Sequence, residues 1–162
     1  MKSFGLVALL FGILNFAGLG LGGVFTGPGV QSNWYAELPQ APWTPPGWVF
    51  GAAWTTVMVG LSLFMAGAWT SHGQRIKVTR TFVLSWVLNV AWNPVFFLWH
   101  QVWLALAVIL ALFVVVVSLA IQTAPPRSPK LPRTQLWWRW CIAPYVVWLL
   151  IATSLNAYSA MA

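Results

Sequence analysis

The sequence predicts an all-α integral membrane bundle of five transmembrane helices, and composition is the first observation behind this prediction. The chain has 162 residues, of which 60% are hydrophobic and 6% are charged. Soluble domains carry about 25% charged residues. Eight basic residues and one acid cannot cover the surface of a soluble protein of this size. The surface therefore faces lipid, which excludes a soluble enzyme, a coiled coil and a disordered tail.

The second observation is a series of apolar runs that are long enough to cross a bilayer, for which a helix needs about 20 residues. Within a single membrane domain covering residues 1–162, we expect spans at about residues 4–25, 48–70, 81–99, 102–122 and 136–158. Only His100 and Gln101 separate the third run from the fourth. One long helix in place of these two spans is therefore the alternative.

The distribution of charge is the third observation, and it decides between four and five spans. With five spans, all eight Lys and Arg residues fall on one side of the membrane and the other side holds only Glu37. With one span over 82–121, the basic loops would fall on opposite sides. Positive loops resist translocation, so we expect five spans with a cytoplasmic N-terminus and the C-terminus outside. The same bias explains the net charge of +7 without a nucleic-acid partner.

Glycine and proline indicate where the spans end. The first apolar run exceeds the roughly 7–15 residues of a signal-peptide core, so we expect a retained helix that ends at Gly27-Pro28-Gly29. Pro94 and residues 99–101 are expected to kink and turn the chain between the third and fourth spans. Four prolines predict that residues 123–135 form an extended, basic, non-helical linker before the fifth span.

Residues 26–47, between the first two spans, are too apolar for an ordinary solvated loop. Prolines restrict their backbone, so ordering them costs less entropy. We expect a lid folded over the mouth of the bundle, with Trp34, Trp43, Pro45 and Pro46 as its characteristic residues. The alternative is an interfacial segment on the lipid headgroups, where Trp and Tyr collect.

Neutral polar and aromatic side chains share one face on each of three spans. The faces are Trp54, Met58, Leu61 and Met65; Ser85, Asn89, Asn93 and Phe96, beside Trp92; and Tyr145, Trp148, Ala152 and Asn156. Ordinary helix packing is one explanation, because Asn side chains hydrogen-bond between helices and aromatic rings fill gaps. Under an aromatic lid, the three faces predict a cavity for a large, flat, mostly apolar ligand.

Catalytic and metal-binding arrangements are not indicated. No ionisable side chain lies near the middle of a span, which argues against a proton relay or an ion-coupled pump. The predicted topology places Glu37 and Cys141 on opposite sides of the membrane, so they cannot act together in catalysis. It also separates His72 from His100, so these two side chains cannot share a metal. Residues 18–23 match GxGxxG, but they lie in an apolar helix without a preceding strand, so they predict helix packing and not a dinucleotide site. We therefore expect no catalytic residue, no metal and no required cofactor.

Three segments carry a resemblance to a known family. Residues 34–54 include Trp-Tyr-Ala and Trp-Thr-Pro-Pro-Gly-Trp-Val, residues 89–97 read Asn-Val-Ala-Trp-Asn-Pro-Val-Phe-Phe, and residues 144–156 include Pro-Tyr-Val-Val-Trp and Leu-Asn. In this order they resemble the first loop and the second, third and fifth helices of the tryptophan-rich sensory protein family. That family is also called the translocator protein, or peripheral benzodiazepine receptor, family.

The resemblance implies a five-helix membrane protein, typically a homodimer, that binds porphyrins such as protoporphyrin IX and other flat apolar ligands under the first loop. It implies a receptor or regulatory protein that influences tetrapyrrole transport or metabolism, and not an enzyme. The alternatives are a transporter of tetrapyrroles or lipids, and light-dependent porphyrin degradation by pocket tryptophans. By matching position, the implied pocket residues are Tyr35, Trp54, Asn89, Trp92, Asn93, Phe96, Trp148 and Ala152.

Two departures limit what the resemblance carries over. Gln40-Ala41-Pro42 replaces a Lys-Pro pattern, so a lysine contact to a ligand carboxylate is not carried over. No basic residue follows Leu155 and Tyr158, so the sterol motif is incomplete. We expect the bilayer to be the cytoplasmic membrane of a bacterium, with the outer membrane of a bacterium or of mitochondria as the alternative.

Overall fold

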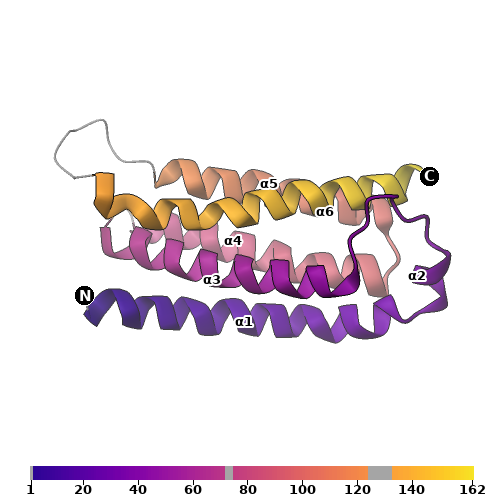
Figure 1. Ribbon diagram of the computed structural model, residues 1–162, viewed down its shortest axis with the longest axis horizontal. Helices are drawn as coiled ribbons and strands as arrows, with labels where there is room; N and C mark the ends of the chain where they lie inside the picture. Colours follow the sequence, from indigo (N-terminus) through magenta and orange to yellow (C-terminus); the bar gives the residue numbers. More distant parts are fainter. Residues whose placement is uncertain (1, 72–74, 124–132) are drawn as a thin grey trace.

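The computed structural model describes residues 2–71, 75–123 and 133–162, and it confirms the all-α, five-span fold. Helices α1 (Lys2–Val30), α3 (Gly47–Ser71), α4 (Arg75–Asn93), α5 (Val102–Gln122) and α6 (Ala143–Met161) form one elongated bundle (Figure 1). The described ranges contain no strand. The orientation of the termini across the membrane stays a prediction.

The helices pack side by side through inward faces of different composition. Helices α3 and α5 bury mostly large apolar side chains, whereas the buried face of α1 consists of Phe11, Asn15 and three glycines. Helix α1 packs against α3 and α4, and α5 packs against α4 and α6. Between them, Phe64, Met65 and Leu112 are almost completely buried. The outer faces are equally apolar, as exposed Leu9 and Val114 illustrate. Lipid, and not water, is the solvent that such a surface requires.

Helix α1 runs five residues beyond the predicted end of its span, and the prediction that Gly27-Pro28-Gly29 ends it is wrong. Pro28 lies inside the helix. The helix continues because its contact with the third span continues. The Thr26 hydroxyl donates to Asn93 Oδ1 at the end of α4 over 2.7 Å, and Gly29 fits directly under the ring of Phe97, which follows in residues 94–98. This packing offsets the one backbone hydrogen bond that a proline removes.

The third span ends in a π-helical turn, η1 (Pro94–Leu98), which includes Pro94. Pro94 has no N–H to donate to the Val90 carbonyl, and the Asn93 side-chain amide donates to that carbonyl instead, over 3.3 Å. After η1, His100 adopts a φ of 55° and the Gln101 N–H donates to the Val95 carbonyl over 3.0 Å. The predicted turn at residues 99–101 is therefore confirmed.

The fifth span consists of a 3₁₀ segment, η2 (Arg133–Ile142), followed by α6. Most of the predicted extended linker 123–135 lies outside the described residues. Its last three residues are helical, so that part of the prediction is wrong. Segment η2 packs tightly on α3, where the ring of Trp138 covers Gly67 and the Cys141 carbonyl reaches Gly60. This close packing supports a helical segment where the basic, proline-rich composition predicted an extended one.

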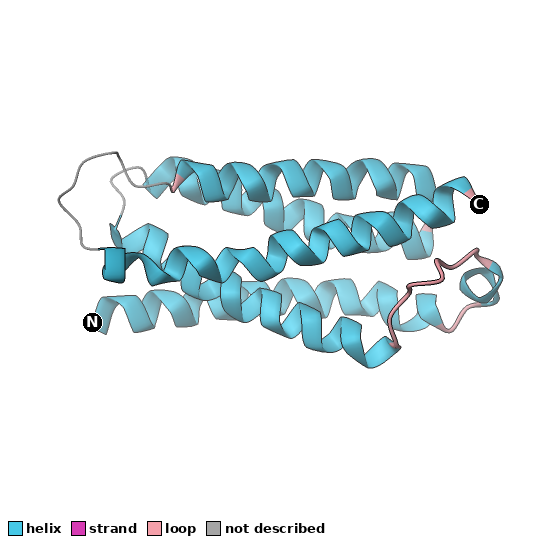
Figure 2. Cartoon of the chain, turned by 45° about the horizontal axis from the view of Figure 1, so that its top comes forward, coloured by secondary structure: helices cyan, strands magenta, loops and turns pink. Residues whose placement is uncertain are grey.

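The connection between α1 and α3, residues 31–46, is called the lid segment below. It contains the short helix α2 (Asn33–Glu37), whose N-cap Ser32 accepts a hydrogen bond from the Tyr35 N–H. Figure 2 shows the segment crossing the end of the bundle that also holds the C-terminus. The predicted lid thus begins at residue 31 and not at residue 26, because α1 is longer than expected.

Candidate ligand pocket

A cavity of about 720 Å³ opens inside the half of the bundle that the lid segment covers. Small-molecule sites usually measure about 300–1,000 Å³, so this volume suits a sizeable organic ligand. Residues of α1, α3, α4, η1, α5 and α6 line the cavity together with the lid segment. Its floor lies near the middle of the bundle, at Leu112 of α5 and Leu149 of α6.

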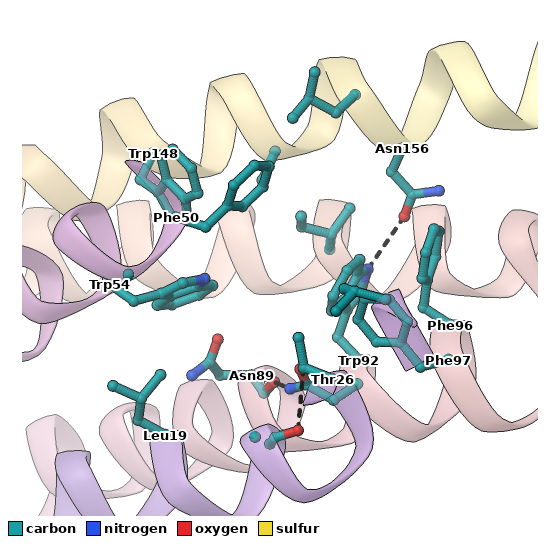
Figure 3. Close-up of a pocket in the computed structure, with 18 of the residues that line it drawn as sticks. Leu19, Thr26, Phe50, Trp54, Asn89, Trp92, Phe96, Phe97, Trp148 and Asn156 are labelled. Atoms are coloured by element: carbon teal, nitrogen blue, oxygen red, sulfur yellow. Dashed lines mark hydrogen bonds between the residues drawn. The ribbon is translucent and has the colours of Figure 1, made fainter. Parts of the chain in front are cut away.

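Aromatic rings form two opposite walls of this cavity (Figure 3). On one side, the Trp148 ring meets Phe50 edge-on with centroids 5.3 Å apart, and Trp54 with centroids 6.3 Å apart. On the other side, Trp92 stacks on Phe96 with centroids 4.9 Å apart and an interplanar angle of 16°. Aromatic faces separated in this way suit a flat ring system placed between them.

Several polar side chains at the cavity are already committed to holding helices together. The Trp92 indole N–H donates to Asn156 Oδ1 over 3.1 Å, and the Asn156 amide donates to the Val102 carbonyl over 3.1 Å. Asn93 accepts from Thr26 and donates back to its own helix. The side chains of these two asparagines therefore link α4 to α6, α5 and α1 through hydrogen bonds. This agrees with the explanation that asparagines in the spans serve helix packing.

Other polar groups at the cavity have no hydrogen-bond partner within the described ranges. Deep in the cavity these are the Asn89 amide, which Figure 3 shows between Trp54 and α1, and the indole N–H of Trp54. The Trp148 indole nitrogen is also buried without a partner. An amide both donates and accepts, whereas an indole only donates. The deep part of the cavity can therefore form hydrogen bonds with a ligand edge that carries both donors and acceptors.

The mouth of the cavity is polar but carries no charge. Tyr35, Gln40 and Thr44 of the lid segment line it. Burial raises the pKa of the Tyr35 phenol, so this group stays a neutral donor at physiological pH. Among the residues that the structure describes, no Lys, Arg, His, Asp or Glu lines the cavity.

The lid segment is fixed to the bundle at several points. The Trp34 ring stacks on His100 with centroids 4.1 Å apart. The Trp43 indole N–H donates to the Ser154 hydroxyl over 3.2 Å, and the Ser159 hydroxyl donates to the Pro39 carbonyl over 2.8 Å. These contacts place the segment across both the turn before α5 and the last turns of α6.

The eight pocket residues that the resemblance implies lie together on the cavity wall. They are Tyr35, Trp54, Asn89, Trp92, Asn93, Phe96, Trp148 and Ala152. Among the four expected lid residues, Pro45 lines the cavity, while Trp34 and Trp43 attach the segment to the bundle. Pro46 accepts the Val49 N–H at the start of α3 and does not line the cavity.

Sequence reasoning missed the contribution of α1. Gly18, Leu19, Gly22, Gly23 and Thr26 line the cavity. The glycine spacing was interpreted only as helix packing, and it does serve packing: Trp86 covers Gly18 and Asn93 covers Gly22. The same absence of side chains leaves room for the cavity. On the second span, Met58, Leu61 and Met65 are core residues away from the cavity.

No group of three His, Cys, Asp or Glu side chains that could hold a metal occurs in the part of the chain that the structure describes. His72 lies outside those residues. His100 lies at the lid end against Trp34, and Cys141 is half-buried in η2.

Comparison with known proteins identifies relatives over nearly the whole chain. The family model described as TspO/MBR matches residues 9–161. The chain is 30% identical over 157 residues to the tryptophan-rich protein TspO of Archaeoglobus fulgidus, covering 93% of this chain and 94% of the relative. It is 27% identical over 126 residues to the tryptophan-rich sensory protein of Cereibacter sphaeroides (76% and 73%). It is 28% identical over 157 residues to the translocator protein of Bos taurus (92% and 85%).

Proposed function

This chain belongs to the TspO/MBR family of membrane proteins, and we propose that it is a receptor that binds a porphyrin in the cavity beneath its lid segment. Protoporphyrin IX is the proposed ligand, and its binding would influence the transport or metabolism of tetrapyrroles. The observation that supports this function is the cavity of about 720 Å³, walled by aromatic rings and free of charge. We further propose a homodimer in the cytoplasmic membrane of a bacterium.

The geometry of the walls explains how a flat macrocycle would be held. The ring would lie between the indoles of Trp54 and Trp148 on one side and the stacked pair Trp92 and Phe96 on the other. Burial of apolar surface contributes about 25 cal/mol per Å², so most of the affinity would come from these rings. The Asn89 amide can both donate and accept, and it would set the orientation of a polar edge.

Binding, and not ordinary catalysis, is the activity that the lining residues support. No carboxylate, imidazole, amine or thiol occurs among the described residues that line the cavity, so these residues offer neither a strong general base nor an activated nucleophile. An uncharged cavity also argues against ion-coupled transport. Light-driven oxidation of a bound porphyrin would need the pigment and dissolved oxygen as the oxidant, with an indole beside the ring. Illumination is therefore a variable of the test.

The test is a titration of the purified protein with protoporphyrin IX in darkness, followed by intrinsic tryptophan fluorescence. We expect a micromolar dissociation constant, equivalent to roughly −8 kcal/mol. Trp54→Phe removes an indole N–H but keeps a ring, so we expect a loss of about 1 kcal/mol. Trp148→Ala also removes a stacking face and should lose more.

The control for this titration is Trp140→Phe, because Trp140 is 80% exposed and lies in η2 at the opposite end of the bundle. It should bind like the parent protein. Equal affinities for all three variants would place the binding site outside this cavity. Repeating the titration under illumination, with the porphyrin absorbance recorded over time, separates a receptor from a light-dependent degrading activity.

A further inference from the structure

We propose that the cavity exchanges its ligand with the hydrocarbon layer of the membrane, through a side opening between α1 and α3, and not with water past the lid segment. The side opening is bordered by Gly23 of α1 and by Gly47, Gly51 and Thr55 of α3. This inference rests on the proposed function, because it assigns a route to the ligand of the same cavity. It also names the class of that ligand, a flat molecule that dissolves in the bilayer.

Exposure of the lining residues shows where the cavity meets the molecular surface. Among the described residues that line the cavity, the exposed ones belong to α1, the lid segment and α3, and they are Gly23, Val30, Gln40, Gly47, Gly51 and Thr55. The lining residues of α4, η1, α5 and α6 are buried or half-buried. The cavity therefore opens sideways between α1 and α3, which lie next to each other in Figure 1.

Helix α1 closes one of its two seams and leaves the other open. Side chains of the third span cover its buried glycines, which are Gly18, Gly22 and Gly29. A Cβ atom added at Gly23 or at Gly51 would instead have no described atom within 4 Å, apart from the nearby backbone of its own helix. The Asn15 amide donates to Ser62 Oγ over 2.9 Å and joins α1 to α3 deeper in the bundle, so the side opening ends there.

The side opening lies at the depth of the lipid acyl chains. Trp48 is 75% exposed and marks the boundary between hydrocarbon and headgroups. Gly51 and Thr55 follow it by one and two helical turns, about 5 Å and about 10 Å further along the axis. The outer surface beside them is apolar, with Val24 and Val59 exposed. A molecule at the side opening would therefore come from the bilayer and not from water.

The ligand site at the inner end of this route is marked by Trp148. This side chain lines the cavity and is 5% exposed, and its indole N–H has no hydrogen-bond partner among the described residues. A buried donor without a partner is costly, so an acceptor on a ligand would stabilise it. The side opening connects this buried donor to the lipid phase.

The way past the lid segment is more obstructed. A ligand that came from water would have to displace that segment, which is held by the stack of Trp34 on His100 and by the hydrogen bond from Trp43 to Ser154. The side opening is bordered by glycines and one threonine, so a flat ring can pass with little displacement of side chains. The lateral route therefore keeps the lid contacts intact.

The same route accommodates a ligand with ionised groups at one edge. Gln40 and Gly47 are exposed at the shallow end of the side opening, beside Trp48 at the headgroup layer. Moving a charge into hydrocarbon is costly. An amphiphilic macrocycle would keep its ionised groups in the headgroup layer while its apolar ring passes between Gly23 and Gly51.

The test narrows the side opening and measures both rates of exchange. Gly23→Leu and Gly51→Leu, singly and together, are placed in phosphatidylcholine vesicles with protoporphyrin IX in darkness. Stopped-flow tryptophan quenching gives the association rate, and dilution into empty vesicles gives the dissociation rate. We expect the double variant to slow both rates by about ten-fold or more, with the dissociation constant within about two-fold of the parental value, because a barrier on the route changes both rates equally. An unchanged dissociation constant also shows that the variant is folded.

Two controls separate the side opening from other effects. Gly5→Leu is the matched variant, because Gly5 lies on the same face of α1 as Gly23, about five turns away, and an added Cβ there also meets nothing within 4 Å. Trp43→Phe removes the hydrogen bond to Ser154 and loosens the lid segment. Both variants should exchange the porphyrin at parental rates, since neither changes the route.

Three results would contradict these expectations. Parental rates in the double leucine variant, or faster exchange in Trp43→Phe, would overturn the lateral route and leave the proposed function standing. A loss of affinity that matches the fall in association rate would show that leucine fills the cavity, and it would overturn the assignment of these glycines to a passage. Failure of the parent protein to bind protoporphyrin IX would overturn the proposed function together with the route.

Discussion

His100 has two structural roles: its backbone forms the turn before α5, and its side chain contacts the lid segment. Its φ of 55° lies in the left-handed region, which non-glycine residues rarely adopt. This conformation lets the Gln101 N–H return to the Val95 carbonyl, a typical way to end a helix. The imidazole ring meanwhile stacks on Trp34, with an interplanar angle of 15°. His100 therefore joins the turn before α5 to the lid segment.

Two substitutions separate these roles. His100→Ala and His100→Gly both remove the stack on Trp34, but only glycine adopts the left-handed conformation without cost. We expect His100→Gly to be more stable than His100→Ala by about 1 kcal/mol. Thermal unfolding in one detergent measures the difference. Equal stabilities would show that the strain of the turn is relieved in some other way.

The hydrogen bond between Trp92 and Asn156 is the second residue-scale prediction. Trp92→Phe and Asn156→Leu each break it. Trp92→Phe should lower the free energy of unfolding by about 1 kcal/mol, and Asn156→Leu should lower it further, because it also removes the donor to the Val102 carbonyl. The double variant should lose less than the sum of the single variants, because both remove the same bond. Trp103→Phe, at a 62% exposed position, is the matched control. Additive losses would mean that the two side chains act independently.

At the scale of elements, the contact between α3 and η2 depends on two glycines. A methyl group at Gly67 would overlap the Trp138 ring, and one at Gly60 would overlap the Cys141 carbonyl. Neither obstacle is the free end of a flexible side chain. Because η2 leads directly into α6, this contact also sets where Trp148 enters the cavity wall.

Gly67→Ala and Gly20→Ala should therefore change stability in opposite directions. Overpacking of a tight contact costs about 1–3 kcal/mol, so Gly67→Ala should destabilise the bundle. At Gly20 an added methyl group meets nothing within 4 Å, and alanine should stabilise α1 by about 0.5–1 kcal/mol. Thermal unfolding of both variants and of the parent protein measures the two changes in stability. A gain in stability for Gly67→Ala would contradict the packing described here.

The same elements show where sequence reasoning works and where it stops. Hydropathy averages over about 20 residues, so it locates a span without knowledge of its neighbours. The end of α1 depends on Asn93 and Phe97, which are far away in the sequence, and no local signal at Pro28 reports them. The glycines of α1 have no side chain to indicate a cavity, and they were therefore understood only as packing residues.

At the scale of the whole molecule, exposed tryptophans mark both ends of the bundle. Trp48, Trp99 and Trp103 are exposed near the lid segment, and Trp137 and Trp140 are exposed in η2. Tryptophan favours the boundary between hydrocarbon and headgroups. The two sets therefore bracket the apolar zone and place the mouth of the cavity at one headgroup layer, with the basic residues of α4 at the other.

The remaining prediction is the direction in which the bundle crosses the membrane. The basic side chains described in α4 and η2 are Arg75, Lys77, Arg80 and Arg139, and both elements place them at the end of the bundle opposite the lid segment (Figure 1). We therefore expect that end to face the cytoplasm and the lid segment to face outward. In a Cys141→Ala background, Gln31→Cys and Ser71→Cys each place one thiol at an exposed position, on opposite sides. A membrane-impermeant maleimide should label Gln31→Cys in intact cells, and it should label Ser71→Cys only after permeabilisation. Labelling of Ser71→Cys from outside would reverse the topology and place the lid segment in the cytoplasm.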